Sequence, residues 1–546
     1  MAKASAGKNF CAKLKSLSLN EGKLKMTISE MLARNRRMYP DDTALIELKP
    51  SQGIRKEITW KQFDERVNRV ANALIDRGIR KGDKVIHWMM NSISWLEAYF
   101  GIIRTGAWAV PLNFRFTSQD FKYCADIAEA KAMILGEEFI DRVETIRSQL
   151  PTIRDYILVG QPLPKGMEDF EQVIGKSSPQ PAEVGLRDED ECALYFTSGT
   201  TGAPKPILLT HKNMECAAIT ENYNHCVTHS DNFLLLQPLY HTGGKMHWFG
   251  SLIVGGPATL LCERITPQKI FEAVHKERAT TAMVLVPWIQ DILTALDRGE
   301  VRKGNYDLSC WHLMHSGAQP VPASLIKRWK KYFPNMQYDT DYGLGEATGP
   351  GCVHLGMENE HKVGAIGKAS FNWEARIVNE KGEDVAPEEV GELLVKGDGV
   401  MKEYYKNPGK TAETIKNGWL YTSDMAKMDN EGFIYLVDRK KDVIIYGGEN
   451  IYPVEIESVL QSHPKIYDVG VIGIPDERLG EIALAVIDPK PGETLTEEEV
   501  NQFCEQNLPR YKRPRRIIFD QVPRNPTGKI EKPKLRQKYA HLGGQP

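Results

Sequence analysis

The sequence predicts an α/β protein with a large N-terminal domain and a smaller C-terminal domain. Three observations support this fold class: a length of 546 residues, helices that alternate with short apolar strands, and a change of pattern late in the chain. A chain of this length exceeds what one compact core usually holds, so at least two domains are expected. With 41% hydrophobic and 26% charged residues, the composition is that of a globular protein.

The first third of the chain shows the alternation of helix and strand. A helix is predicted to begin after Thr59, which matches a capping box with Gln62, and Gly78 supplies its C-terminal stop. Apolar residues between these ends fall on one helical face. A strand at 85–88 and a helix around 95–103 follow. This succession is typical of α/β subdomains with buried strands.

The pattern changes after about residue 370. Residues 374–438 carry more glycine, more charge and short β-like runs, which predicts a small β subdomain. A charged hexamer at 437–442 lies between two apolar runs and indicates a boundary. The predicted order is an N-terminal domain over 1–437, a hinge over 438–442 and a small α+β domain over 443–546.

The last hundred residues support the α+β prediction. Strands are expected at 469–474, 482–487 and 517–519. Thr496 with Glu499 predicts a capped helix between the second and third of these strands. The chain contains no internal repeat and no low-complexity tract.

Composition and charge argue against several classes of protein. The formal net charge of -2 and the lack of a long Lys or Arg block argue against nucleic-acid binding. No apolar run approaches the roughly 20 residues that span a bilayer, and the N-terminal lysines are not followed by the apolar core of a secretory signal. The nine cysteines form no Cys-x-x-Cys pair, which indicates reduced thiols. We therefore expect a soluble, cytoplasmic protein without a transmembrane segment.

A segment dense in hydroxyl groups and glycine follows an expected strand end at 194–196. Glycines let the backbone approach a ligand, and hydroxyls, amides and a lysine offer donors to phosphate oxygens. A polar surface turn is the alternative interpretation. The residues expected to bind phosphate are Thr197, Ser198, Gly199, Thr200, Thr201, Gly202 and Lys205.

The spacing of this segment differs from a Walker P-loop. There the lysine directly follows a glycine, whereas Lys205 lies three residues beyond Gly202 and precedes Pro206. We therefore expect nucleotide chemistry other than γ-phosphoryl transfer.

The segment resembles the signature loop of the adenylate-forming superfamily, which contains acyl-CoA and aryl-CoA synthetases, luciferases and the adenylation domains of peptide synthetases. Further segments between about residue 25 and 540 match the same superfamily in the expected order. The resemblance implies that the loop is mobile and holds the β- and γ-phosphates of ATP. Pro206 stands where the superfamily usually has glycine, which predicts a stiffer end to the loop.

The resemblance also implies a site for the nucleoside. Tyr342 would stack on adenine, while Asp424 of the segment 421–424 and Arg439 would bind the ribose hydroxyls, a role that carboxylates also have in dinucleotide sites. The residues implied to bind ATP or AMP, besides the loop, are Gly317, Ala318, Gln319, Asp341, Tyr342, Gly343, Asp424 and Arg439.

A divalent cation is implied beside the nucleotide. Glu346 resembles the metal-holding glutamate of the superfamily, an oxygen ligand suited to Mg²⁺, and Thr200 is the expected second ligand. Gly345 replaces a threonine whose hydroxyl reaches toward the α-phosphate. One such hydrogen bond contributes about 1 kcal/mol, so activity is expected to survive its loss.

The resemblance assigns catalytic and moving parts to the second half of the chain. Lys441 would sit at the hinge about which a mobile C-terminal domain rotates. Gly447 and Gly448 would line the tunnel for the pantetheine arm of CoA. The predicted catalytic residues are Lys529, His241 and Glu346.

The acyl group is the least defined part of the predicted site. His241 stands near the position where peptide-synthetase domains carry an aspartate for an α-ammonium group, so an amino-acid substrate is disfavoured. Lys245 is expected to be a surface lysine with a snorkelling side chain, with a contact to substrate or pyrophosphate as the alternative. The predicted acyl pocket consists of His241, Trp248, Gly317 and Gly349.

These features predict an AMP-forming acyl-CoA synthetase. A carboxylic acid would react with ATP to acyl-AMP, and CoA would then take the acyl group, both steps being reversible. The acid is expected to be apolar: aromatic, alicyclic or medium-chain. Two alternatives stay open, an adenylating enzyme with another acceptor and a non-catalytic acyl-nucleotide sensor. The sequence also leaves open whether the protein is a homodimer.

Overall fold

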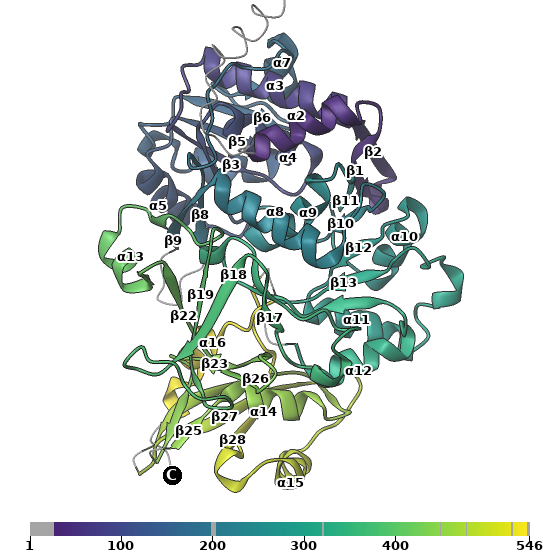
Figure 1. Cartoon of the computed structure of the whole chain (residues 1–546), viewed down its shortest axis with the longest axis vertical. Coiled ribbons are helices and arrows are strands. Elements are labelled where there is room, and N and C mark those ends of the chain that lie inside the picture. The colour runs from purple at the N-terminus through teal and green to yellow at the C-terminus, as the bar shows by residue number, and fades with distance from the viewer. Residues whose placement is uncertain are drawn as a thin grey trace, which may run out of the picture.

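The chain folds into a mixed α/β structure, as the sequence predicts. The computed structural model describes residues 27–197, 204–318, 321–447, 449–476, 478–525 and 528–542. Along the long axis in Figure 1, two helix-covered sheets come first, a mostly antiparallel β region follows, and a smaller α+β region lies at the C-terminal end.

The first large sheet has eight strands in the order β20-β9-β8-β4-β3-β5-β6-β7. β3 to β8 pair in parallel, whereas β9 returns antiparallel to β8. Its strands are β3 Lys84–Trp88, β4 Trp108–Pro111, β5 Ala132–Gly136, β6 Asp155–Val159, β7 Glu168–Asp169, β8 Glu191–Thr197, β9 Lys205–Thr210 and β20 Glu403–Tyr404. The helices of this part are α2 Ile28–Met38, α3 Trp60–Asp76, α4 Ile93–Arg104, α5 Ser118–Ala128, α6 Ile140–Glu144 and α7 Phe170–Lys176.

The second large sheet has seven strands in the order β14-β13-β12-β10-β11-β1-β2. All its pairs are parallel except the edge pair β1–β2. Its strands are β1 Thr43–Lys49, β2 Ile54–Thr59, β10 Phe233–Leu235, β11 Ala258–Leu261, β12 Thr281–Met283, β13 Leu313–His315 and β14 Gln337–Asp339. Its helices are α8 His211–His225, α9 Thr242–Leu252, α10 Pro267–Glu277, α11 Val286–Asp297 and α12 Ala323–Tyr332.

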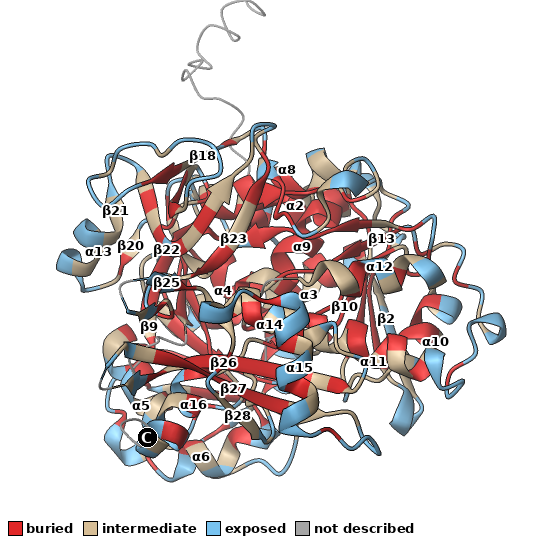
Figure 2. Cartoon of the chain, turned by 90° about the horizontal axis from the view of Figure 1, so that it is seen from below, coloured by how far each residue is buried: buried red, intermediate tan, exposed pale blue. Residues whose placement is uncertain are grey.

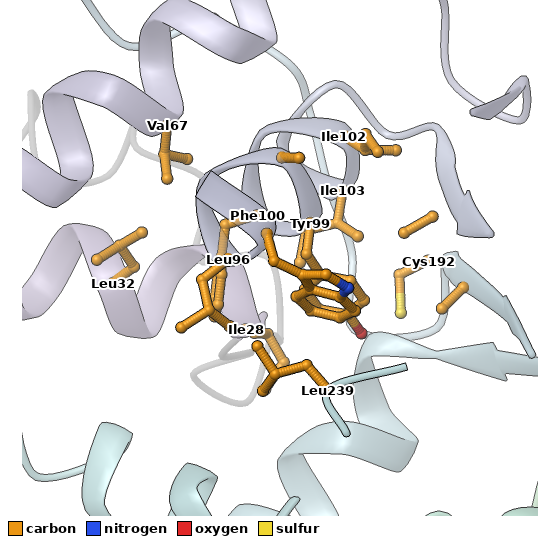
Figure 3. Packing of buried hydrophobic residues seen from close by; sticks show 14 of the residues in the cluster. Ile28, Leu32, Val67, Leu96, Tyr99, Phe100, Ile102, Ile103, Cys192 and Leu239 are labelled. Atoms are coloured by element: carbon orange, nitrogen blue, oxygen red, sulfur yellow. The ribbon is translucent and has the colours of Figure 1, made fainter. Parts of the chain in front are cut away.

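The largest hydrophobic core joins the two sheets. It combines buried residues of α2, α3 and α4 with residues of both sheets and of α8 and α9. Figure 3 shows Tyr99 and Phe100 of α4 close to Leu32 of α2, Cys192 of β8 and Leu239. The two sheets therefore share one core and hold α8 and α9 in fixed positions.

The β region consists of two small antiparallel sheets. One has the order β15-β16-β17; in the other, β18-β19-β22-β21, β23 also pairs with β22. The strands are β15 Tyr342–Gly343, β16 Pro350–Val353, β17 Lys368–Ala369, β18 Trp373–Val378, β19 Gly391–Gly397, β21 Ile415–Lys416, β22 Trp419–Met428 and β23 Ile434–Arg439. The short helix α13 covers Pro408–Thr414.

The C-terminal region is a five-stranded sheet with helices on both faces. The order is β25-β24-β27-β26, and β28 pairs in parallel with β27. Figure 2 shows the buried lengths of β26 and β27 beside α14 and α15. The elements are β24 Ile444–Tyr446, β25 Glu449–Ile451, α14 Pro453–Gln461, β26 Ile466–Asp476, β27 Gly480–Pro489, α15 Glu497–Asn507, β28 Arg516–Phe519 and α16 Lys532–Tyr539.

The predicted local signals are found in the structure. Thr59 and Gln62 form a capping box at the start of α3, and Thr496 and Glu499 form another at the start of α15. Each cap needs a hydroxyl and a side-chain acceptor three residues apart, so sequence spacing alone is enough to predict it.

The charged hexamer at 437–442 is less exposed than a solvated linker. Its first three residues end β23, and Asp438 and Asp442 are buried. Asp438 Oδ2 accepts a hydrogen bond from Val454 N of α14 at 2.9 Å, and Asp442 pairs with Arg536 at 2.6 Å. Acidic side chains of the hexamer thus contact elements of the C-terminal region.

Among the described residues, no helix has the length and apolarity needed to cross a membrane.

Candidate active site

The predicted phosphate loop connects the antiparallel strands β8 and β9. Thr197 and Lys205 face each other at the open end of this hairpin. Ser198, Gly199, Thr200, Thr201 and Gly202 lie outside the described residues. A shallow cavity of about 310 Å³ adjoins the hairpin end and is lined by Lys205, Pro206, Tyr404, Asn407 and Lys410.

The predicted nucleoside residues meet around one carboxylate. The antiparallel register of β22 and β23 sets Asp424 opposite Arg439, whose Nε lies 2.5 Å from Asp424 Oδ1. The Tyr342 hydroxyl donates to Asp424 Oδ2 at 2.6 Å. Burial and the neighbouring carboxylate raise the pKa of Tyr342 well above its usual value, so this hydroxyl remains a donor.

The turns around Tyr342 depend on close backbone approaches. A Cβ on Gly343 would lie 2.5 Å from Gly349 O, and one on Gly345 would lie 3.0 Å from Thr197 Cγ2. The second contact gives a steric reason for glycine at position 345. From the sequence alone, this glycine is described only by the threonine hydroxyl that it lacks. Gly345 thus lets the segment with Glu346 lie against the end of β8.

Glu346 is the only predicted metal ligand that the described residues include. The Tyr404 hydroxyl donates to its Oε1 at 2.7 Å, and its backbone oxygen accepts from Met401 N. The partly exposed carboxylate is a hard oxygen donor of the kind that Mg²⁺ prefers. The residue therefore fits the predicted role.

Lys529 lies in a tight turn near the C-terminus. The Asn525 side-chain oxygen accepts from Lys529 N at 2.9 Å. Next to it, Gly528 has a positive φ of 80°, and its Cβ position lies 3.3 Å from Pro287 Cδ at the start of α11. The turn thereby contacts the seven-stranded sheet region and brings Lys529 to the nucleoside residues.

The ammonium group of Lys529 has several charged neighbours. Burial and the nearby Arg439 lower the pKa of Lys529 to about 8, although the carboxylates of Asp424 and Glu346 act in the opposite direction. Burial, together with Lys529, lowers the pKa of His241 to about 3, so this imidazole is neutral. Lys529 is thus near enough to both His241 and Glu346 to interact with them electrostatically.

His241 is held by its own backbone and by a buried lysine. It is the N-cap of α9, and its Nδ1 accepts from Gly243 N at 3.2 Å. Lys245 Nζ donates to the carbonyl oxygens of Leu239 at 3.0 Å and His241 at 3.3 Å. Hydrogen bonds from Gly243 N and from the Lys245 ammonium therefore both stabilise the turn before α9.

The prediction that Lys245 is a surface lysine is wrong. The residue is 0% exposed, and its ammonium lies 4.4 Å from the ring centre of Tyr195 and 5.4 Å from that of Tyr99. Burial lowers the pKa of Lys245 well below its usual value. These aromatic neighbours belong to β8 and α4, which are distant in sequence.

The predicted acyl-pocket residues are not all at one place. Trp248 packs in the hydrophobic core, with its ring centre 6.2 Å from that of Phe100. Gly349 approaches α8, where its Cβ position lies 2.8 Å from Ala217 Cβ. Gly317 lies at the end of β13, against Asp341. Next to Gly317 in sequence are two residues predicted to bind ATP or AMP: Ala318 has a left-handed φ of 67°, and Gln319 is outside the described residues.

The predicted hinge residue lies in the segment that joins β23 to β24, whereas the described CoA residue lies in the turn between β24 and β25 of the C-terminal sheet. Lys441 follows β23, and burial lowers its pKa. Gly447 follows β24 with a positive φ of 57°, and its N–H donates to Leu479 O. Gly448 lies outside the described residues. Their roles in hinge motion and CoA binding stay predictions.

A chain of alternating acidic and imidazole side chains lies at the carboxyl ends of β13 and β14, and sequence reasoning missed most of it. His247 Nδ1 is 2.6 Å from Glu221 Oε1, and its Nε2 is 3.1 Å from Asp341 Oδ2. His225 Nδ1 is 3.2 Å from Glu221 Oε2, and its Nε2 is 2.7 Å from Asp339 Oδ2. We call Asp341, His247, Glu221, His225 and Asp339 the acid–imidazole chain.

One signal for this chain exists in the sequence. Glu221 and His225 are four residues apart in α8, so they share a helical face. Because the other members come from α9 and from two strand ends, only tertiary structure brings them together.

Comparison with known proteins identifies the family. The AMP-binding enzyme model matches residues 32–405, and the model for the AMP-binding enzyme C-terminal domain matches 455–529. The long-chain-fatty-acid–CoA ligase FadD13 of Mycobacterium tuberculosis is 32% identical, covering 94% of this chain and 98% of its own. Indoleacetate–CoA ligase of Aromatoleum aromaticum is 31% identical over the same shares of the two chains.

Solved structures of similar proteins also include CoA ligases. The anthranilate CoA ligase AuaEII in complex with anthranoyl-AMP has a TM-score of 0.87 at 26% identity, covering 96% of this chain and 99% of its own. ATP-bound MatB from Rhodopseudomonas palustris has a TM-score of 0.84 at 26% identity, covering 95% and 100%.

The fold and the grouping of Tyr342, Asp424, Arg439 and Lys529 define the class of adenylate-forming enzymes. Within that class the chain belongs to the AMP-binding enzyme family, in its CoA-ligase branch. The predicted resemblance, fold class and ligase class are confirmed.

Proposed function

We propose that the protein is an AMP-forming acyl-CoA synthetase that uses Asp424, Arg439 and Lys529 as the centre of its adenylation site. The observation that carries this proposal is the approach of Lys529, from a C-terminal turn, to the Asp424–Arg439 pair of the β region. A cation delivered by a separate region suits a reaction in which two anions must meet.

In the first half-reaction, a carboxylate oxygen of the acid attacks the α-phosphorus of MgATP. A bond forms between these atoms, the bond from the α-phosphorus to the bridging oxygen breaks, and pyrophosphate leaves. Lys529 and Arg439 would neutralise charge on the reacting groups, while Asp424 would accept hydrogen bonds from ribose hydroxyls. Bound magnesium, held by Glu346 and by phosphate oxygens, would supply further neutralisation.

In the second half-reaction, the CoA thiol sulfur attacks the acyl carbonyl carbon, its proton is lost, and AMP leaves. We propose that the C-terminal region rotates about Lys441 and exchanges Lys529 for the face with Gly447 and Gly448. Domain rotation of this kind lets one site serve two reactions.

The acid is proposed to carry an aromatic, alicyclic or medium-chain group. Relatives named for long-chain fatty acids, for indoleacetate and for a dioxo-octahydroindenyl propanoate support such a range. A magnesium requirement, a role in fatty-acid metabolism and a cytoplasmic location also belong to the proposal. The last is supported by the free cysteines of the described residues.

Pyrophosphate exchange with a panel of acids, with and without CoA, tests the proposal. We expect acid-dependent exchange, and thioester formation when CoA is added. Exchange without any thioester would favour an adenylating enzyme with another acceptor. No exchange with any acid, despite measurable ATP binding, would favour an acyl-nucleotide sensor.

A further inference from the structure

Lys245 is a buried basic residue that the proposed reaction does not use. It lies near the start of α9 and is 0% exposed. Among the described residues, no carboxylate pairs with its ammonium. Burying a charge without an acidic partner is unfavourable, and a cation near a helix N-terminus also opposes the helix dipole. Other interactions must therefore offset the cost of this placement.

Carbonyl oxygens and aromatic rings supply those interactions. Lys245 Nζ donates to Leu239 O at 3.0 Å and to His241 O at 3.3 Å. It also lies 4.4 Å from the ring centre of Tyr195 and 5.4 Å from that of Tyr99, distances at which a ring attracts a cation. Figure 3 shows Tyr99 and Leu239 in this part of the core. Because an ammonium and a neutral amine both have at least two N–H groups, either form can serve both carbonyls.

The turn from Gln237 to His241 is also held from a second direction. The Asn91 side chain, just before α4, donates to Gln237 O at 2.8 Å and accepts from Leu239 N at 2.9 Å. Gly244 packs closely under the turn, since a Cβ there would lie 2.8 Å from Gln237 Cβ. Side chains before α4 and in α9 thus determine together where the backbone of His241 lies.

The backbone of this turn in turn orients the His241 imidazole. Its Nδ1 accepts from Gly243 N at 3.2 Å. Since burial, together with Lys529, lowers the pKa of His241 to about 3, the ring is neutral and carries its one proton on Nε2. Lys529 is near enough to act on this ring electrostatically. The direction of the His241 Nε2–H therefore depends on the turn that Lys245 holds.

Two alternatives fit the structure less well. A direct contact between Lys245 and a substrate would need an exposed ammonium, but the side chain has no exposed surface and Nζ already donates to two carbonyl oxygens. A side chain that only fills the core is the second alternative. An apolar side chain of the same length would fill that space without burying a polar group. The hydrogen bonds to the turn are what a lysine adds.

We propose that Lys245 is a positioning residue for acyl-AMP formation, which acts by fixing the turn that orients His241. This inference rests on the proposed acyl-CoA synthetase function. A group displaced by about 1 Å can lower a rate by about 10²-fold, even when the altered residue is remote from the reacting atoms. The effect should fall on kcat more than on the KM for ATP, because Lys245 has no contact with the nucleoside residues around Asp424.

The first experiment replaces Lys245 by methionine in the full-length protein. Lys245→Met keeps an unbranched side chain but removes the N–H donors. With an acid that the wild type accepts, single-turnover acyl-AMP formation should slow by about 10- to 100-fold, with little change in the KM for ATP. Met214→Leu is the matched control in the same core: it removes a sulfur that accepts from the Tyr99 hydroxyl and leaves the hydrogen bonds of the turn in place. Its rate should stay close to that of the wild type.

A double-mutant cycle then tests whether Lys245 acts through His241. Independent residues give losses that multiply, whereas residues that act as one unit do not. His241→Ala combined with Lys245→Met should therefore be no slower than His241→Ala alone. If Lys245→Met does not fold, Lys245→Gln enters the same cycle, since it also removes the long chain that reaches the two carbonyl oxygens.

Several results would overturn the inference. Losses that multiply in the double variant would mean that Lys245 acts independently of His241. A wild-type rate in Lys245→Met, or in His241→Ala, would remove the positioning role altogether, and so would a loss that appears only as a higher KM for ATP. If the wild type forms acyl-AMP with no acid, the proposed function itself fails. An active wild type with multiplying losses refutes the positioning role alone.

Discussion

The nucleoside group and the acid–imidazole chain are two clusters of charged residues with opposite construction. In the first, Arg439, 38% exposed at its side chain, pairs with Asp424, which also accepts from Tyr342, and Lys529 lies near this pair. In the second, side-chain exposure is 5% or less throughout, and each imidazole has both ring nitrogens within 3.2 Å of carboxyl oxygens. The first cluster is partly open to a ligand, whereas the charged groups of the second are buried against one another.

The largest expected effect concerns the buried cluster. Glu221→Gln leaves His225 and His247 without their shared carboxylate. Breaking a buried ion pair at one partner costs about 3 to 5 kcal/mol, so the melting temperature should fall steeply. Asp424→Asn, in the more open cluster, should change the melting temperature far less. Similar losses in the two variants would contradict the contrast between the clusters.

The next effect concerns catalysis. Lys529→Ala should slow acyl-AMP formation by about 10²- to 10³-fold, because one charge-stabilising group is lost. Thioester formation from supplied acyl-AMP should change much less. Single-turnover measurements of each half-reaction test this, and Lys534→Ala in α16 is a control on an exposed lysine. Equal losses in both half-reactions would reject the assignment of Lys529.

A third effect is the dependence of stability on pH. The pKa of His247 is raised to about 9 from an ordinary 6.5, so its stabilising contribution is fully present below about pH 6.5 and is lost as pH rises through 9. Denaturant titrations should show a decline of about 3 kcal/mol between pH 7 and 10. His247→Gln should flatten that part of the curve. An equally steep decline in the variant would assign it to other groups.

The smallest expected effect concerns ATP binding at the nucleoside group. Tyr342→Phe removes the hydroxyl that donates to Asp424, and a hydrogen bond to a charged group contributes about 1.5 to 3 kcal/mol. The melting temperature should fall modestly, by less than in Glu221→Gln, and the KM for ATP should rise by about 10-fold. An unchanged KM would mean that Asp424 is held sufficiently by Arg439.

The two clusters also show what the sequence can predict. Local caps such as Thr59 with Gln62 depend on a three-residue spacing, and Asp424, Arg439 and Lys529 lie in motifs that are contiguous in sequence. His247 has no such context, because its partners come from α8 and from the end of β14. The prediction for Lys245 fails for the same reason, since the rings that surround it belong to other elements.

The contact between Gly317 and Asp341 has an evolutionary consequence. A Cβ at position 317 and the Asp341 oxygen would occupy overlapping space, so the two positions cannot vary independently. The backbone oxygen of Asp341 also lies 2.9 Å from that Cβ position, so a shorter side chain at 341 would not by itself make room for alanine or serine at 317. A descendant can therefore enlarge residue 317 only if the backbone at 341 moves as well.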